Sequence, residues 1–216
     1  LGLAAGASGL AFAALKRRPG TLLILGGTGF IGPHITDVAL ARGWKVTHFN
    51  RGKRKPEGIA GVEHLSGDRD GQLDALKGRK WDAVIDNSGY VPRIVRQSAE
   101  LLAPNVGQYL FVSSISVYAS LATPQDETSP VAKLKDETVE KVDGETYGGL
   151  KALCEQAVER ALPKRTIVVR PGYIVGPLDP TDRFTYWPVR VARGGEMLAP
   201  GAPADPIQVI DARDLA

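Results

Sequence analysis

Short apolar segments alternate with segments of helical periodicity along most of this chain. Apolar residues recur three and four positions apart over residues 31–41, 91–102 and 146–162, which predicts three amphipathic helices. Gly43 closes the first of these helices, and a shorter helical pattern covers residues 73–77. The apolar runs that we expect to form strands are residues 21–25, 45–49, 62–65, 82–86, 108–113 and 165–170.

Strands that alternate with helices pair in parallel through right-handed crossovers. We therefore predict an α/β fold, a doubly wound, Rossmann-like parallel sheet with helices on both faces. In such a sheet, ligands bind beyond the carboxyl ends of the strands. Two stretches interrupt the alternation, residues 114–145 and the region that begins at Pro171. Loops of such length in a compact domain usually carry a function or lack order.

The turn after the first strand reads Gly26-Gly-Thr-Gly-Phe-Ile-Gly32 and leads directly into a helical pattern. Glycine lets the backbone turn sharply and approach a ligand closely, and the unpaired N–H groups at a helix start favour an anion. The preceding strand and the following helix distinguish this turn from one that only connects two elements. We expect it to hold the pyrophosphate of a dinucleotide through Gly26, Thr28, Gly29, Phe30, Ile31 and Gly32.

The composition is that of a globular protein, with 43% hydrophobic and 24% charged residues among 216. The 27 basic and 24 acidic side chains leave a net charge of +3, which is too small to indicate nucleic acid binding by itself. The single cysteine, Cys154, excludes an internal disulfide and a cysteine-based metal cluster. The three histidines show no ligand spacing, so we expect no metal site.

The two ends of the chain raise separate questions. The stretch from Leu1 to Leu15 is rich in Ala, Gly and Leu and precedes Lys16-Arg-Arg18. It resembles the tail of a twin-arginine signal, which exports folded proteins, and the alternative is an N-terminal extension of a cytoplasmic protein. It is too short for a membrane span, which needs about 20 apolar residues. At the other end, residues 211–216 stop as a helix begins, so we expect the C-terminal part to be incomplete.

Tyr147 and Lys151 lie four residues apart at the start of a predicted helix, so they share one face. A tyrosine has a reference pKa of about 10 and serves as an acid–base catalyst near neutral pH only where its anion is favoured. A nearby ammonium and a helix N-terminus both favour that anion. The spacing alone is common on helices, but here it follows a strand that ends Phe111-Val-Ser-Ser114. Those serine hydroxyls would lie at the carboxyl edge of the sheet, where ligands bind.

Together these motifs resemble the extended short-chain dehydrogenase/reductase superfamily, of the NAD-dependent epimerase/dehydratase type, over about residues 20–216. In that family the tyrosine is the acid–base catalyst, the lysine lowers its pKa and bonds the nicotinamide ribose, and a serine orients the substrate oxygen. The resemblance assigns these roles to Tyr147, Lys151 and Ser114. It also implies an NAD(P)-binding domain over residues 20–170. The matching pieces are residues 26–32, 113–118, 147–151, 170–177 and 210–216.

The resemblance divides the rest of the chain as well. Residues 171–216 would begin a smaller substrate-binding domain, and residues 1–19 would lie outside both domains. Because Asp211 to Ala216 match a motif beyond which the family builds much of that smaller domain, we expect the substrate pocket to be incomplete.

The residues after the second strand bear on the choice of cofactor. NAD-preferring relatives usually carry an acid there that bonds the ribose hydroxyls, whereas this chain has Asn50-Arg51. Without a carboxylate a 2′-phosphate is not repelled, and Arg51 with Lys53 or Arg54 could pair with it. We therefore favour NADP, with NAD as the alternative. The other residues expected at the cofactor are Asp68, as the adenine-reading acid or a helix N-cap, Asn87 and Ser88, with Lys151 at the ribose.

The residues expected near the substrate differ from those of two branches of the family. Sugar dehydratases carry an acidic pair where this chain has Ile115-Ser116, and many nucleotide-sugar enzymes carry Asn where Tyr173 stands. We predict an oxidoreductase or epimerase that acts on a hydroxyl or carbonyl of a sugar-like small molecule, with Tyr90 and Tyr173 as candidate substrate contacts. The alternative is a weakly catalytic NAD(P)-binding sensor or RNA-associated protein, as among some plastid relatives. For the enzyme we expect no nucleic acid partner, and a homodimer is left open.

Overall fold

A computed structural model describes residues 19–54 and 59–216, so nearly all of the signal-like segment lies outside the described residues. The centre of the molecule is a six-stranded parallel sheet with the strand order β3-β2-β1-β4-β5-β6. This order is that of a doubly wound, Rossmann-like fold, which confirms the predicted fold class. The strands are β1 (Thr21–Leu25), β2 (Lys45–Asn50), β3 (Val62–Ser66), β4 (Trp81–Asp86), β5 (Val106–Val112) and β6 (Thr166–Val169).

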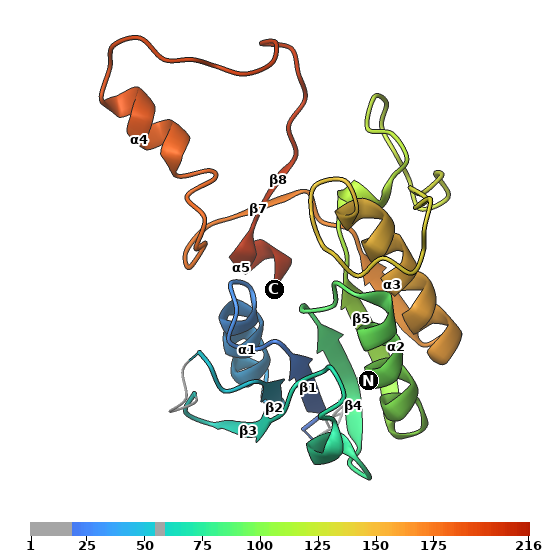
Figure 1. The fold of residues 1–216 in the computed structure, drawn as a ribbon. Helices are drawn as coiled ribbons and strands as arrows, with labels where there is room; N and C mark the ends of the chain where they lie inside the picture. Colours follow the sequence, from blue (N-terminus) through green and yellow to red (C-terminus); the bar gives the residue numbers. More distant parts are fainter. Residues whose placement is uncertain (1–18, 55–58) are drawn as a thin grey trace, which may run out of the picture.

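Helices cover both faces of the sheet because successive strand residues point to opposite sides. On one face, Leu23 and Leu25 of β1 pack in a core with α2 (Pro92–Leu102) and α3 (Tyr147–Ala161). These two helices lie side by side in Figure 1. On the other face, Leu22 and Ile24 join a second core with α1 (Gly32–Ala41) and α5 (Ala212–Leu215). A strand buried on both faces reads as a continuous apolar run, which is the pattern of residues 21–25.

Most predicted elements form within one or two residues of their expected bounds, and one differs in kind. The helical pattern at residues 73–77 is a single 3₁₀ turn, η1 (Asp74–Leu76), which buries Leu76. A glycine with positive φ, Gly78, follows it and stops further helix. Two more 3₁₀ turns are η2 (Ala103–Asn105) and η3 (Ile115–Val117).

The irregular region after Pro171 contains a second, two-stranded sheet that the local sequence pattern does not reveal. β7 (Tyr173–Val175) pairs in parallel with β8 (Val209–Asp211), and between them the chain forms α4 (Tyr186–Ala192). In Figure 1 this segment extends away from the main sheet. Strands of three residues are too short to show alternation, so only their pairing identifies them. Among the described residues, no helix is long and apolar enough to cross a membrane.

Candidate functional site

The strand order reverses between β1 and β4, and the crevice at that point is where doubly wound sheets bind ligands. The glycine-rich turn follows β1, and Asn87, Ser88 and Gly89 follow β4. The first turn of α3 lies beyond the next strand, β5. The residues that the sequence singles out therefore meet at one edge of the sheet.

The glycines of the turn differ in the space that the protein leaves for a side chain. Gly26 has a φ of +91°, a conformation that side chains disfavour. A Cβ at Gly27 would overlap the ring of His48, and a Cβ at Gly32 would lie 2.5 Å from the Gly27 carbonyl carbon. A Cβ at Gly29 would meet no protein atom closer than 3.6 Å. A Cβ at Gly29 would thus make only ordinary van der Waals contacts within the protein, so the protein itself does not require glycine there, whereas close approach of a pyrophosphate would.

This difference predicts opposite phenotypes for substitutions three residues apart. Gly32→Ala should lower the free energy of unfolding, because its Cβ has no space against Gly27. Gly29→Ala should fold normally and lose dinucleotide affinity by about tenfold or more. Urea denaturation and calorimetric titration with NAD and NADP measure the two effects. Undiminished binding by Gly29→Ala would show that the ligand does not approach this position.

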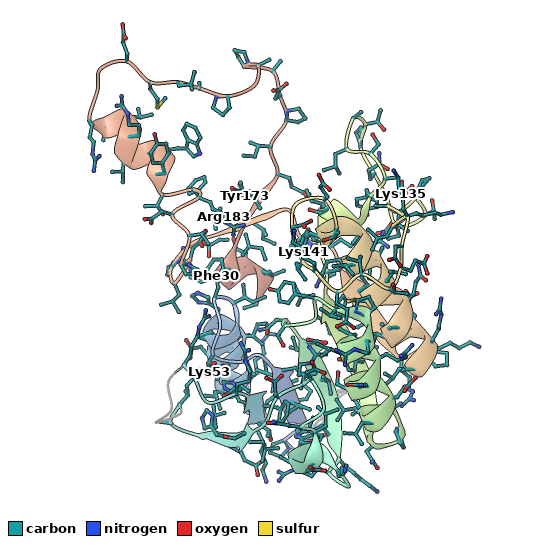
Figure 2. All side chains as sticks on the ribbon, in the orientation of Figure 1. Phe30, Lys53, Lys135, Lys141, Tyr173 and Arg183 are labelled. Atoms are coloured by element: carbon teal, nitrogen blue, oxygen red, sulfur yellow. The ribbon has the colours of Figure 1, made fainter. Side chains whose placement is uncertain are left out.

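The apolar side chains of the turn, Phe30 and Ile31, have structural roles besides the expected contact of their main chains with a phosphate. Ile31 is buried and is the N-cap residue of α1, and Phe30, like Ile174 and Leu215, packs against the core formed with α1 and α5. Phe30 is labelled close to α5 in Figure 2. Their main chains, together with Thr28 and the glycines, remain the parts able to face a phosphate.

The loop after β4 is tied to the glycine turn by side chains. The amide nitrogen of Asn87, in the orientation that satisfies its neighbours, donates to the carbonyls of Leu25 and Gly26 at 2.7 and 3.0 Å. Ser88 Oγ donates to the Leu25 carbonyl at 3.1 Å. Asn87 and Ser88 are thus placed along the crevice, and they also hold its two sides together.

The predicted adenosine end gathers Asn50, Arg51 and Asp68 beyond β2 and β3. Asn50 Oδ1 accepts a hydrogen bond from the Gly52 N–H at 2.8 Å, and Arg51 is exposed. Asp68 Oδ1 accepts from the Asp70 N–H at 3.1 Å, so Asp68 closes a local turn and caps no helix. Arg54 Nη1 lies 4.0 Å from the position that a Cβ at Gly29 would occupy. This basic loop therefore reaches the glycine turn, although residues 55–58 lie outside the described part.

Lys151 is almost fully buried, with 3% of its surface exposed, and its ammonium is held by main-chain carbonyls. Nζ donates to Gly89 O at 2.8 Å and to Val112 O at 2.7 Å, and it lies 4.2 Å from the ring centroid of Phe111. Burial lowers the pKa of this lysine to about 8, while the nearby Asp86 carboxylate acts in the opposite direction. An ammonium has three N–H donors, so one remains for a ligand hydroxyl.

Tyr147 is the first residue of α3, one helical turn before Lys151 on the same face. Its ring centroid lies 6.4 Å from that of Tyr90, whose side chain is 46% exposed. The Tyr90 ring in turn lies 5.3 Å from Lys151 Nζ. The structure thus groups Tyr90, Tyr147 and Lys151, and it leaves Tyr90 accessible rather than packed in the core.

Ser114 follows β5 and is engaged with Ser116. Ser114 Oγ donates to Ser116 Oγ and accepts from the Ser116 N–H, both at 3.1 Å. A hollow of about 510 Å³ opens beside Tyr147, with Ser116, Asp143 and Glu145 among the residues of its wall. This hollow offers space for a small molecule beside Tyr147, and Ser116, the hydrogen-bond partner of Ser114, lies in its wall.

Two of the matching sequence pieces, residues 113–118 and 170–177, meet at Arg170, the residue after β6. Arg170 forms a two-pronged ion pair with the buried Glu155 of α3, at 2.7 and 3.1 Å, and its guanidinium lies 4.9 Å from the ring centroid of Tyr118. Tyr173 lies farther out on β7, 38% exposed, with Arg183 stacked 4.8 Å from its ring centroid. Figure 2 shows Tyr173 and Arg183 together above Phe30.

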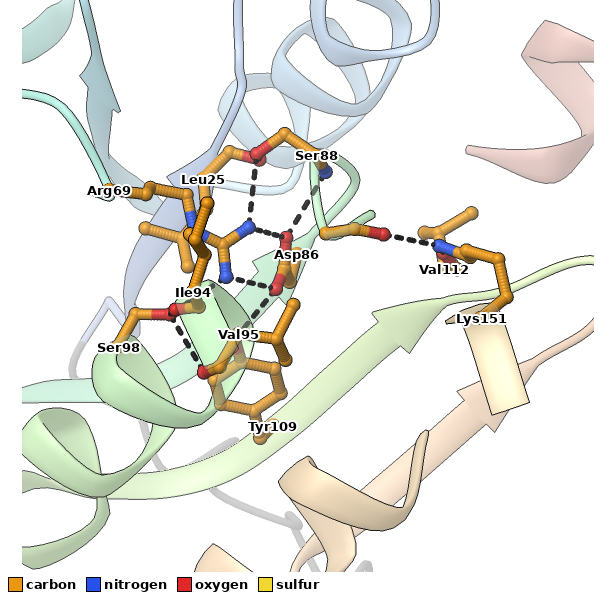
Figure 3. A network of polar contacts seen from close by, with 11 residues as sticks. Leu25, Arg69, Asp86, Ser88, Ile94, Val95, Ser98, Tyr109, Val112 and Lys151 are labelled. Atoms are coloured by element: carbon orange, nitrogen blue, oxygen red, sulfur yellow. Dashed lines mark hydrogen bonds and ion pairs between the residues drawn. The ribbon is translucent and has the colours of Figure 1, made fainter. Parts of the chain in front are cut away.

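Sequence reasoning missed a buried cluster beneath the β4 loop, formed by Arg69, Asp86, Tyr109 and Ser98 (Figure 3). A signal for it exists, since Asp86 directly follows the apolar residues 83–85 of β4, and a buried carboxylate needs a partner. Across residues 19–54 and 59–216, no group of three His, Cys, Asp or Glu side chains could hold a metal ion.

The family model described as the NAD dependent epimerase/dehydratase family matches residues 22–216, which is most of the chain. This chain belongs to that family. The family assignment agrees with the resemblance carried by the glycine turn and the motif from Tyr147 to Lys151. The roles of individual residues are a separate question.

Individual relatives are more distant. The chain is 26% identical over 219 residues to the chloroplast stem-loop binding protein of 41 kDa b of Arabidopsis thaliana, covering 90% of this chain and 53% of that protein. It therefore spans about half the length of this curated relative. Among solved structures, MoeE5 in complex with UDP-glucose and NAD is similar with a TM-score of 0.68 at 20% identity, over 91% of this chain and 69% of that one.

A human structure extends the comparison to a second cofactor. The epimerase family protein SDR39U1, solved with NADPH, is similar with a TM-score of 0.62 at 24% identity, over 90% of this chain and 67% of that one. These likenesses support the Rossmann-like fold.

Proposed function

We propose that the chain is part of an NAD(P)-dependent oxidoreductase or epimerase that uses Ser114, Tyr147 and Lys151. The observation that carries this proposal is the buried ammonium of Lys151, held by two carbonyls one helical turn from the Tyr147 phenol. Burying an ammonium costs desolvation free energy that an apolar side chain at the same position would avoid, so a buried lysine indicates a functional role. The remaining N–H of Lys151 can donate to a ribose hydroxyl. Its positive charge favours the anionic form of a neighbouring phenol.

The residues present fit a dinucleotide. A Cβ at Gly29 would meet no protein atom closer than 3.6 Å, the start of α1 presents N–H groups, and Lys151 has one N–H beyond the two that bond carbonyls. A bound nicotinamide nucleotide would supply the hydride acceptor or donor. Tyr147 would take the proton from a substrate hydroxyl, or return it to a carbonyl oxygen. Ser114 would orient that oxygen after its hydroxyl turns away from Ser116.

The proposal is tested by calorimetric titration of the chain with NAD and NADP, and by mass spectrometry of nucleotide that co-purifies with it. We expect saturable binding of at least one of the two dinucleotides. Absence of binding to both would refute the proposal, because every assigned role depends on a bound nicotinamide.

For the cofactor we propose NADP, because the residue after β2 is not an acid and a basic loop reaches the glycine turn. Arg51 is exposed and Arg54 lies near Gly29, so both can approach a 2′-phosphate. Arg51→Ala should weaken NADP binding by about tenfold or more and leave NAD binding unchanged, since only NADP carries that phosphate. Paired titrations with the two cofactors measure this. An equal loss of affinity for NAD and NADP would indicate that Arg51 contacts a group that the two cofactors share.

For the substrate we propose a polyhydroxyl compound of the sugar class. The hollow beside Tyr147 has the polar residues Ser116, Asp143 and Glu145 in its wall, and MoeE5, a structural relative, was solved with UDP-glucose. Tyr173 and the stacked Arg183 would contact the part of the substrate remote from the reacting carbon. A screen of nucleotide-linked and free sugars, read through nicotinamide absorbance, would identify the substrate.

A second candidate function is RNA association, favoured by the 26% identity to a chloroplast stem-loop binding protein. The net charge of +3 and the buried lysine argue for the enzyme first. Titration of a labelled RNA stem-loop at two salt concentrations, with and without dinucleotide, separates the two. Salt-dependent binding that Lys151→Met leaves unaltered would favour the RNA role.

A further inference from the structure

The cluster beneath the β4 loop is built around a buried ion pair. Asp86 and Tyr109 have no exposed surface, and Arg69 is 9% exposed. Arg69 donates to the two carboxylate oxygens of Asp86 at 2.7 and 2.8 Å, and to Ser98 Oγ at 2.7 Å. Tyr109 OH donates to Asp86 Oδ2 at 2.8 Å. The carboxylate is thus surrounded by donors, as a buried charge requires.

The cluster is continuous with the loop that borders the crevice. Asp86 Oδ1 accepts the Ser88 N–H at 3.1 Å, and Arg69 Nη1 donates to Ser88 Oγ at 3.3 Å. Ser88 Oγ in turn donates to the carbonyl of Leu25, the last residue of β1 before the glycine turn. The main chain and side chain of Ser88 are therefore both oriented by the ion pair (Figure 3).

Gly89 links the Arg69–Asp86 ion pair to Lys151. A Cβ at Gly89 would lie 3.2 Å from Asp86 Oδ2 and 2.6 Å from the Phe111 ring, so the Gly89 main chain rests on the carboxylate and this ring. Its carbonyl accepts from Lys151 Nζ at 2.8 Å. The other carbonyl that holds this ammonium, that of Val112, belongs to β5. On the β4 side, the position of the ammonium therefore depends on the main chain of Gly89.

We propose that the Arg69–Asp86 pair positions Lys151 and the end of the glycine turn by fixing the main chain of Ser88 and Gly89, and this inference rests on the proposed function. Apolar side chains of similar volume often stabilise a fold as well as a buried ion pair does. They cannot, however, orient a peptide by hydrogen bonds. Arg69 and Asp86 are positioning residues, because they act on the cofactor crevice through the loop.

The test is the variant Arg69→Met/Asp86→Leu, which replaces the pair by apolar side chains and avoids an unpaired buried charge. The measured quantity is the ratio of dinucleotide affinity to the affinity of its adenine half, with ADP as the half for NAD and 2′,5′-ADP for NADP. We expect this ratio to fall by about tenfold or more, because Lys151 would contact only the nicotinamide half. An unchanged ratio in the folded variant overturns the positioning role.

Tyr109→Phe provides a milder variant that removes one hydrogen bond to Asp86 and keeps the ring. Its ratio should fall by about two- to tenfold, and an unchanged ratio overturns the inference even if the double variant does not fold. Arg165→Met is the matched control, since Arg165 bonds the carbonyls of Ala103 and Val106 at the opposite end of β5. Arg165→Met should leave the affinity ratio unchanged. An equal fall of the ratio in this control would show that a general loss of rigidity in the fold, rather than the Arg69–Asp86 pair, causes the effect. Failure of the unaltered chain to bind any dinucleotide would instead refute the proposed function.

Discussion

Tyr147→Phe is expected to bind the dinucleotide as tightly as the unaltered chain and to lose turnover by about 10²- to 10⁴-fold. The substitution removes only the hydroxyl that exchanges a proton with the substrate, while the ring keeps its place at the start of α3. Lys151 retains both of its carbonyl partners, since neither belongs to Tyr147. Turnover is followed by nicotinamide absorbance with the sugar identified in the substrate screen.

Tyr90→Phe is the control for this experiment. The ring centroid of Tyr90 lies 6.4 Å from that of Tyr147 and 5.3 Å from Lys151 Nζ. The Tyr90→Phe variant therefore removes a phenol hydroxyl from the same surroundings. It should keep most of the turnover. If instead Tyr90→Phe abolishes turnover and Tyr147→Phe does not, the acid–base role belongs to Tyr90.

Asp86→Leu alone is expected to lower the free energy of unfolding by about 3–5 kcal/mol, because it leaves the Arg69 guanidinium buried without its carboxylate. Adding Arg69→Met should recover most of that loss, since the double variant buries no unpaired charge. Urea denaturation of the two single variants and the double variant forms a complete cycle.

The control for the cycle is Glu63→Gln, which weakens the exposed ion pair with Arg79. Both side chains of that pair are more than a third exposed, so the change should cost less than about 1 kcal/mol. A double variant as unstable as Asp86→Leu would show that hydrogen bonding, rather than the unpaired charge, dominates the cost. The stability cycle and the affinity ratio report on different properties, so a stable double variant with weakened nicotinamide binding is the expected combination.

The parts of the fold that could be predicted are those encoded by residues close in the sequence. Alternation of apolar runs with helical periodicity specified the parallel sheet, and the turn from Gly26 to Gly32 marked the crevice at its edge. The spacing of Tyr147 and Lys151 placed both on one face of α3. The 3₁₀ turn at Asp74–Leu76 was predicted as a longer helix, because a few apolar residues cannot distinguish one turn from several.

What the sequence by itself determined is therefore the Rossmann-like sheet, the family and the edge of the sheet at which the candidate site residues lie. Only the tertiary structure decided which carbonyls hold Lys151, that Arg69 pairs with Asp86 from 17 residues away, and that β7 pairs with β8. Periodicity and glycine sterics are local properties, which neighbouring residues reveal. Burial and hydrogen-bond partnership depend on distant segments that come together only in the folded chain, and they decide whether a lysine or a carboxylate can remain charged inside it.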